Sequence, residues 1–290
     1  MKFACSLGNH PADSRLISDE RGFVLSMKYW LKLLLLLLLL LAFPLCGQAG
    51  SLTDLRISYG DVDSMDDIRS ISWYTQTDGG NERYIFLPAE ADASKLRIWF
   101  TGTNVLTVDG KKVKSGAQLS LTPDSEITVS NGSKNYRVHV MQAGEQGSVY
   151  LTTESGSLKE IDRYRTHIES GTALVADADG TIYTQQDMES FRIRGNGSST
   201  FVKKSYQMKL TSKANLFGMG KSKTWLLISN YKDWTNLRNM LVYEMARYAG
   251  LPYTPECVYV NLYVNHEYRG LYLFIEKLQV SSTRVDIADL

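Results

Sequence analysis

Apolar and polar residues alternate along much of residues 51–142. For example, Leu96, Ile98 and Phe100 alternate with Arg97 and Trp99, which is the two-residue period of a half-buried β-strand. Asp109-Gly110 and Asn131-Gly132 lie between such segments, and these pairs are typical of tight hairpin turns. Turn signals about every eight to twelve residues, with no helical period, predict a small antiparallel β-sandwich. We place this immunoglobulin-like module at residues 51–147, and we favour a spacer over a binding surface as its role.

Residues 148–290 form a second β-rich region that contains one segment with a helical period. In residues 234–249, apolar side chains recur at steps of three and four, so one stripe of the predicted helix should face a core. The stripe consists of Leu237, Leu241, Met245 and Tyr248, with Met240 and Glu244 beside them. Asp233 precedes the helix as an N-cap, and Gly250 marks its end. The chain therefore has the pattern of an α+β protein, with the sandwich first.

A polyleucine run at residues 33–41 predicts that the protein is exported. Lysines precede the run and small residues follow it at Gly47 and Ala49, which is the pattern of a cleaved secretory signal peptide at residues 27–49. The apolar run is shorter than the roughly 20 residues of a membrane-spanning helix, so we favour cleavage over a retained anchor. We expect a secreted or cell-envelope protein that meets the membrane only through this segment, if the segment stays uncleaved.

Two further interpretations concern the same N-terminal region. Cys46 could be acylated as in a lipoprotein, although Leu45 before it fits the required motif poorly. Residues 1–26 carry acidic residues and a proline, unlike a compact basic leader, whereas Met27 is followed directly by Lys28. We therefore expect residues 1–26 to be an overextended start, with the leader beginning at Met27.

The charge and the cysteine content argue against several classes of protein. The chain has 32 Lys and Arg residues against 31 Asp and Glu residues, a net charge of +1, which argues against a general nucleic-acid binder. Cys257 is the one cysteine that would remain after cleavage, so neither an internal disulfide nor a cysteine-based metal site is expected. The acidic segment 177–180 resembles half of a calcium loop without its distal glutamate, so we interpret it as a hairpin turn.

Basic residues and glycines lie close together between residues 194 and 204. Arg194 leads into a turn with Gly195 and Gly197, where a ligand can approach the backbone because no Cβ intervenes. Lys203 and Lys204 then enter a predicted strand. A lysine on a strand beside a glycine-containing turn is an arrangement that kinases use to hold nucleotide phosphates. The alternative is a solvated basic edge that prevents strand pairing.

A second polar segment surrounds the start of the predicted helix. It contains Asn230, Asp233, Arg238 and Asn239. Arg238 can form a structural ion pair with Asp233 or Glu276, or it can face an anion. The residues alone leave both alternatives open.

Three segments of this region resemble the CotH kinase-like family, also called the spore coat protein H family. The motifs are residues 203–206 (Lys-Lys-Ser-Tyr), residues 230–239 and residues 268–272 (Tyr-Arg-Gly-Leu-Tyr). The resemblance covers residues 148–290 and implies the β-rich N-terminal half of an atypical protein-kinase-like domain, truncated at its C-terminus. Members of the family transfer phosphate from ATP to protein serines. The resemblance therefore implies ATP and Mg²⁺ as cofactors and a secreted or surface protein as the substrate.

The resemblance also implies roles for the polar residues. The residues implied to lie near the nucleotide phosphates are Arg194, Gly195, Lys203 and Lys204. The supporting residues are Asn230, Asp233, Arg238, Asn239 and Glu276. The family's metal-binding and catalytic aspartates belong to motifs that would follow Leu290, so no catalytic or metal-binding residue is assigned. We expect the 290-residue chain alone to be inactive, and the alternative function is a non-catalytic secreted or cell-envelope binding protein.

Overall fold

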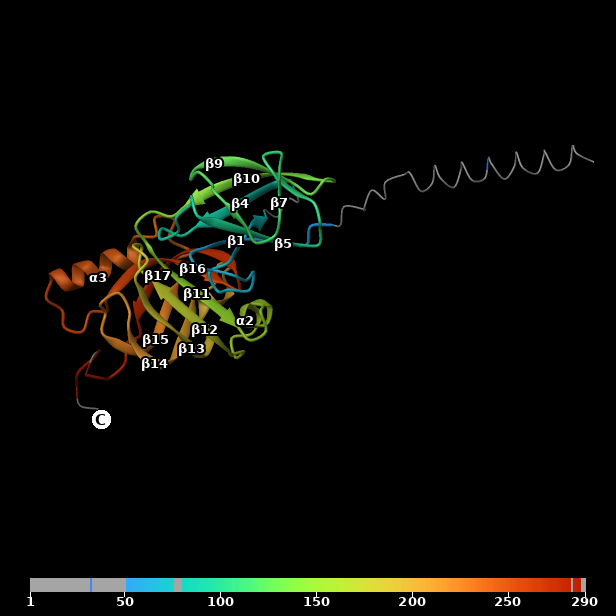
Figure 1. Ribbon diagram of the computed structural model, residues 1–290. Coiled ribbons are helices and arrows are strands. Elements are labelled where there is room, and N and C mark those ends of the chain that lie inside the picture. The colour runs from blue at the N-terminus through green and yellow to red at the C-terminus, as the bar shows by residue number, and fades with distance from the viewer. Residues whose placement is uncertain (1–31, 33–50, 76–79, 283, 288–290) are drawn as a thin grey trace, which may run out of the picture. The chain divides into compact units, whose positions relative to one another are not determined.

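The computed structural model describes Lys32 and residues 51–75, 80–282 and 284–287 (Figure 1). Apart from Lys32, the predicted signal peptide and the expected overextended start lie outside the described residues. Residues Ala49–Leu290 form one compact unit, which contains a β-sandwich and a β-barrel. Within the described part of the chain, no helix is long and apolar enough to cross a membrane.

The β-sandwich consists of two sheets around an apolar core. One sheet has the strand order β2-β1-β5-β8, and the other has the order β3-β4-β10-β9-β6-β7. The strands are β1 (Asp54–Tyr59), β2 (Ile71–Ser72), β3 (Tyr74–Thr75), β4 (Glu82–Leu87), β5 (Leu96–Thr101), β6 (Leu106–Val108), β7 (Lys111–Val113), β8 (Ala117–Leu119), β9 (Ser125–Ser130) and β10 (Asn135–Gln142). The alternating residues Leu96, Ile98 and Phe100 are buried in the core, as their pattern predicts. Pairing is antiparallel except between β4 and β10.

Two predicted hairpin turns are confirmed. Asp109 and Gly110 join β6 to β7 with φ angles of 48° and 77°, the left-handed conformation that a two-residue hairpin turn requires. The acidic segment 177–180 joins two later strands, with Gly180 at a φ angle of 89° and the Asp179 carboxylate accepting a hydrogen bond from the Thr181 N–H at 2.8 Å. Local backbone chemistry therefore sets both turns.

The barrel is a closed sheet with the strand order β11-β12-β13-β14-β15-β17-β16 (Figure 1). The strands are β11 (Gly147–Thr153), β12 (Glu169–Ala176), β13 (Ile182–Ile193), β14 (Tyr206–Asn215), β15 (Lys221–Ile228), β16 (Cys257–Val264) and β17 (Glu267–Glu276). Two short helices connect them: α2 (Lys159–Arg163) and the 3-10 helix η1 (Gly197–Thr200). The first and last strands of this order, β11 and β16, pair in parallel. The strand-rich architecture confirms the predicted fold class.

Large apolar side chains fill the barrel interior and determine which residues face outward. Trp225, Phe191 and Phe274 are fully buried in this core. Because side chains alternate along a strand, Arg192 lies on the outer face of β13, between the buried Phe191 and Ile193. Arg192 and the residues that follow β13 are therefore on the outer surface of the barrel.

The predicted helix is shorter than expected, and its buried face is a different one. It is α3 (Arg238–Tyr248), whereas the sequence predicted residues 234–249. Asn236 has a left-handed φ angle of 58°, which interrupts the helix before Arg238. Asp233 still caps it indirectly, because its carboxylate accepts a hydrogen bond from the Arg238 N–H at 2.8 Å.

The stripe that was predicted to face a core is instead exposed. Leu241 and Met245 are 57% and 61% exposed, and Leu237 and Tyr248 are exposed as well. Met240, which the sequence placed beside the stripe, packs together with Tyr243 on a cluster formed by Leu226, Cys257, Leu273 and Ile275. The prediction was wrong because α3 has apolar residues on both faces, and only the barrel determines which face is buried.

Candidate functional site

Arg194 is the basic residue at the centre of the candidate site. It follows β13 and is half-buried, and burial lowers the pKa of its guanidinium below the ordinary value. Within the described ranges, its side chain takes part in no hydrogen bond or ion pair. A partly desolvated cation without a counter-charge is unfavourable, so an anion that reached this guanidinium would be bound strongly.

Arg194 lines a cavity of about 250 Å³ together with several of the residues predicted from the sequence. The others are Asn230, Asp233, Arg238 and Asn239. They come from the loop after β15 and from the start of α3, whereas Arg194 comes from the end of β13. The structure thus brings together two polar segments that lie far apart in the sequence.

Amide hydrogen bonds hold the loop of this cavity in place. The Asn239 side-chain N–H donates to Asn230 Oδ1 at 2.7 Å, and the Asn230 side-chain N–H donates to the Asn236 carbonyl at 3.1 Å. Asn230 itself has a left-handed φ angle of 49°. Both amides therefore hold the loop between β15 and α3 in place.

Arg238 has only a weak ion pair, so its guanidinium is available to a ligand. The Arg238 Nε lies 3.6 Å from Asp233 Oδ1, and the Arg238 side chain is 78% exposed. An exposed pair of this kind contributes about 0–1 kcal/mol. The backbone N–H of Arg238 and the hydroxyl of Thr235 bond to the Asp233 carboxylate and lower its pKa. Both alternatives for Arg238 therefore coexist: it pairs loosely with Asp233 and still borders the cavity.

Lys203 borders an adjacent hollow of about 430 Å³, which shares Asn230 and Asp233 with the first cavity. Its Nζ donates to the Leu271 carbonyl at 2.6 Å and lies 4.5 Å from the centre of the Tyr272 ring. Burial lowers the pKa of Lys203 to about 8. The lysine is therefore held on the site by the barrel strand β17.

Lys204 and Gly195 shape the turn beside the cavity. The Lys204 Nζ donates to the Ser199 carbonyl at 2.9 Å, which holds η1 against the start of β14, and Lys204 borders neither cavity. Gly195 has a φ angle of 96°, and a Cβ at this position would clash with Ser198 Oγ. The expectation that Lys204 lies at the phosphates is not supported by this geometry, whereas Gly195 adjoins Arg194.

Glu276 borders a different hollow beside Arg194, and its carboxylate is paired with another residue. Its carboxylate pairs with Arg284, a side chain that is almost fully buried and lies over the Trp225 ring at 4.8 Å. Burial raises the pKa of Glu276. An ion pair between Glu276 and Arg238, one of the alternatives drawn from the sequence, is therefore not formed.

A third hollow, of about 280 Å³, was not predicted from the sequence. Arg194 and Tyr243 border it, and its floor is apolar, with Leu226, Ile228 and Ile275. Tyr243 reaches it because α3 packs on the outer face of the barrel. The helical period at residues 238–248 could have suggested this contact only if the buried face of α3 had been known.

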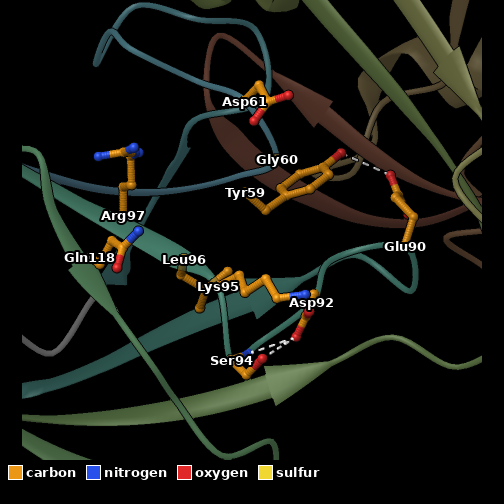
Figure 2. Close-up of a pocket in the computed structure, with 10 residues that line it drawn as sticks. All are labelled: Tyr59, Gly60, Asp61, Glu90, Asp92, Ser94, Lys95, Leu96, Arg97 and Gln118. Carbon is orange, nitrogen blue, oxygen red and sulfur yellow. Dashed lines mark hydrogen bonds and ion pairs between the residues drawn. The ribbon is translucent and has the colours of Figure 1, made fainter.

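A hollow of about 400 Å³ lies in the sandwich, and two of its carboxylates, unlike the Arg194 guanidinium, have partners within the described part of the protein (Figure 2). Asp92 borders it, but its carboxylate pairs with Lys95 at 3.1 Å and accepts a hydrogen bond from the Ser94 hydroxyl at 2.6 Å. These bonds lower the pKa of Asp92 to about 2. The charge of Asp92 is therefore already compensated within the protein.

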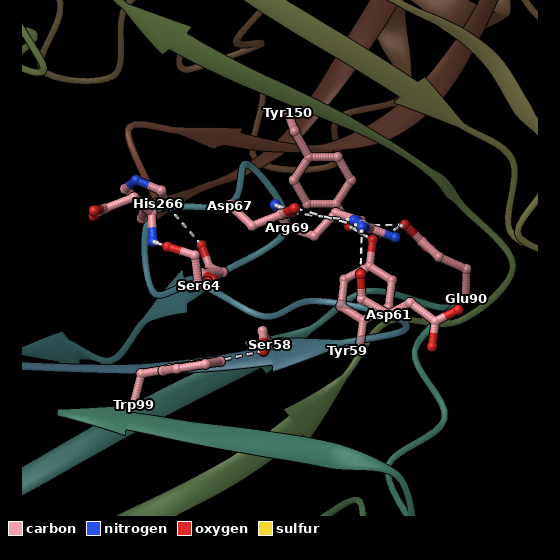
Figure 3. Close-up of polar contacts among 12 residues, drawn as sticks. Ser58, Tyr59, Asp61, Ser64, Asp67, Arg69, Glu90, Trp99, Tyr150 and His266 are labelled. Carbon is pink, nitrogen blue, oxygen red and sulfur yellow. Dashed lines mark hydrogen bonds and ion pairs between the residues drawn. The ribbon is translucent and has the colours of Figure 1, made fainter. Parts of the chain in front are cut away.

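Glu90, which borders the same hollow, belongs to a hydrogen-bond network (Figure 3). Its carboxylate accepts hydrogen bonds from the Tyr59 hydroxyl at 2.9 Å and the Tyr150 hydroxyl at 2.7 Å. Burial raises its pKa. Tyr59 belongs to β1 of the sandwich and Tyr150 to β11 of the barrel, so we interpret this network as structural.

Magnesium has no evident ligand set at the candidate site. In the part of the chain that the structure describes, no three His, Cys, Asp or Glu side chains are grouped to hold a metal ion. Asp233 is the one carboxylate that borders the Arg194 cavity among its described residues, and both of its oxygens accept hydrogen bonds, from Thr235 and Arg238. The site fits phosphate groups better than it fits a divalent cation.

Comparison with known proteins agrees with the geometry. Residues 191–289, about a third of the chain, match the family described as CotH kinase protein. The matched segment contains every site residue predicted from the sequence. No curated protein matches the chain. The predicted resemblance is thereby confirmed.

Proposed function

From the CotH kinase character of residues 191–289, we propose that this chain is the ATP-binding part of an exported atypical protein kinase. Its substrates would be serines of secreted or surface proteins. The observation that carries the proposal is Arg194, a half-buried guanidinium without a partner in the described ranges, which borders a cavity together with Arg238. Two guanidinium groups at one cavity suit an oligophosphate, since each can donate two parallel hydrogen bonds to phosphate oxygens.

The neighbouring hollows suggest how the rest of a nucleotide would be bound. Arg194 borders both the polar cavity and the apolar hollow at Tyr243. In our proposal the phosphates lie at Arg194 and Arg238, and the base lies on the apolar floor beside Tyr243. Lys203 adds a positive charge at the other side of the loop. This arrangement uses Arg194 and Lys203 from the first polar segment that the sequence identified and Arg238 from the second.

Phosphate transfer requires more than this set of residues supplies. In kinases, magnesium held by carboxylates neutralises the charge that develops on the transferred group. The Asp233 carboxylate is engaged with backbone and hydroxyl donors, so we assign no magnesium ligand to the described residues. We therefore derive nucleotide binding from this geometry and assign no transfer step to the described residues.

Titration with a fluorescent ATP derivative tests the proposal. The full chain should bind it, and Arg194→Ala should weaken binding by about tenfold or more, because a charge-assisted hydrogen bond contributes about 1.5–3 kcal/mol. Lys213→Ala removes an exposed positive charge on β14 and serves as the control, with unchanged affinity expected. Equal affinities of the wild-type protein and Arg194→Ala would refute the proposal.

One observation favours the alternative, a non-catalytic binding protein of the cell envelope. It is the same lack, within the described ranges, of a side-chain group that could hold a metal. The titration separates the two functions, because a binding protein of this kind has no need for ATP. A wild-type chain that fails to bind the nucleotide would support the alternative.

A further inference from the structure

Three arginines border one further hollow on the outer face of the barrel. The hollow has a volume of about 210 Å³, and we call it the arginine hollow. Its lining consists of Arg165, Arg192, Ile193, Arg194, Gly195 and Gln207. Arg192 and Gln207 are paired neighbours on β13 and β14, and Arg165 comes from the loop between α2 and β12. The sequence did not indicate that Arg165 reaches this place, because only closure of the barrel brings it there.

The positive charges of the arginine hollow are not compensated within the described part of the protein. No hydrogen bond or ion pair there involves the side chains of Arg165, Arg192 or Arg194. The lining contains no acidic residue. Three like charges around one small volume repel one another, and an anion bound there would relieve this repulsion.

The carboxylates that flank Arg165 in the sequence are engaged with other groups. Asp162 accepts a hydrogen bond from the Tyr206 hydroxyl at 2.7 Å and lies 3.5 Å from Arg269. Glu169 lies 2.9 Å from His167 Nε2. Neither carboxylate borders the arginine hollow. The uncompensated charge is therefore a property of the folded surface, and an external anion would supply the missing partner.

We propose that the arginine hollow binds the phosphate group of a phosphoserine in the protein substrate. This inference rests on the proposed function. A phosphoserine has close to two negative charges and three acceptor oxygens at neutral pH, which match several guanidinium donors better than a single carboxylate does. Arg165 is exposed, so a group attached to a polypeptide can enter from solvent. The net charge of +1 argues against general attraction of polyanions.

The shared residue Arg194 places the arginine hollow beside the proposed nucleotide site. Arg194 borders both, so a bound phosphoserine and the nucleotide phosphates would lie on two sides of one side chain. The hollow would therefore select substrates in which a phosphoserine lies near the acceptor serine in the sequence. In this way a first phosphorylation would promote a second one nearby.

Fluorescence anisotropy with the full chain tests the inference. The probe is a labelled peptide with a phosphoserine three residues from a serine. Arg165→Gln combined with Arg192→Gln should weaken binding of this peptide by about tenfold or more, because two charged donors are lost. Affinity for the fluorescent ATP derivative should stay unchanged, since Arg194 is retained.

Arg163→Gln is the matched control. Arg163 is exposed two residues before Arg165, lies over the Tyr164 ring at 5.0 Å, and does not border the arginine hollow. It should leave peptide affinity unchanged. Arg192→Lys keeps the charge but loses the paired donors of the guanidinium, so it should give an intermediate affinity with a native melting temperature.

Further ligands separate the possible sources of the anion. The same peptide with serine or glutamate in place of phosphoserine should bind at least about tenfold more weakly, and a single-stranded DNA oligomer should not compete. Equal binding of the serine peptide, tighter binding of the DNA, or an undiminished affinity in the double variant would overturn the inference. ATP binding without phosphopeptide binding would refute this inference alone. Phosphopeptide binding that depends on the arginines, without ATP binding, would refute only the proposed function.

Discussion

Lys203 should react with an amine-directed reagent at a lower pH than an ordinary lysine does. Burial lowers its pKa to about 8, against about 10.4 for a lysine in water. At pH 8 roughly half of the Lys203 side chains would be neutral, compared with roughly one in 250 for an ordinary lysine. A less basic amine is also a weaker nucleophile, as is known for thiols, so the net advantage in rate should be roughly tenfold.

The assay is competitive labelling with a limiting amount of an acetylating reagent between pH 6 and pH 11, with the modified peptides measured by mass spectrometry. Lys213, which is exposed on β14, is the internal reference. Labelling of Lys203 should show an inflection near pH 8. Bound ATP should move this inflection upward, because phosphate charges favour the protonated amine.

Two outcomes would refute this reasoning in different ways. An inflection near pH 10 would show that Lys203 is not desolvated, contrary to its contacts with the Leu271 carbonyl and the Tyr272 ring. An inflection near pH 8 that ATP does not move would confirm the burial of Lys203 but contradict its position beside the nucleotide.

Three other changes test the turn, the sandwich network and α3 in denaturation experiments. Gly195→Ala should lower the free energy of unfolding by about 1–2 kcal/mol, because Gly195 has a positive φ angle. Gly197→Ala should change it by about 0.5 kcal/mol or less, because a Cβ at position 197 meets open space. Equal effects of the two substitutions would contradict the strained turn at Gly195. Burial raises the pKa of Glu90 in the folded protein above its value in the unfolded chain, so Glu90 stabilises the fold fully at a pH below the unfolded pKa and loses this contribution as the pH rises through the folded pKa. The free energy of unfolding of the wild-type protein, relative to that of Glu90→Gln, should therefore fall over this pH interval. A difference that stays constant with pH would contradict the burial. Met245→Lys should leave the melting temperature unchanged and reduce binding of a hydrophobic dye, because Met245 is exposed. Met240→Ala should destabilise the protein by about 2 kcal/mol, because Met240 packs on the barrel. A larger loss of stability for Met245→Lys than for Met240→Ala would show that the face of α3 predicted from the sequence is the buried one.

The sequence predicted those parts of the fold that depend on local chemistry. The hairpin at Asp109-Gly110 follows from two residues that accept positive φ angles, and neighbouring strands need only a two-residue period. The parallel pairing of β11 with β16 joins segments far apart in the chain, and no local pattern indicates it. The start of α3 was misplaced because the left-handed Asn236 interrupts a continuous apolar period.

The candidate site could be predicted only in part, for the same physical reason. Arg194 and Arg238 were identified from their segments, but their common cavity depends on the packing of α3 against the barrel. Lys204 was expected at the phosphates, yet its Nζ bonds to the Ser199 carbonyl, because both lysines lie in the turn before β14 and no strand period fixes where they point. Arg165 lies in a loop without a motif, so only the folded barrel shows its proximity to Arg192.

A crystal structure of the full chain soaked with a non-hydrolysable ATP analogue and Mg²⁺ tests the central claim most directly. Our account predicts phosphate oxygens within hydrogen-bonding distance of the Arg194 guanidinium, in the cavity shared with Arg238. It would be contradicted by phosphates bound elsewhere on the protein, or by a cavity closed by the protein's own backbone with no room for them.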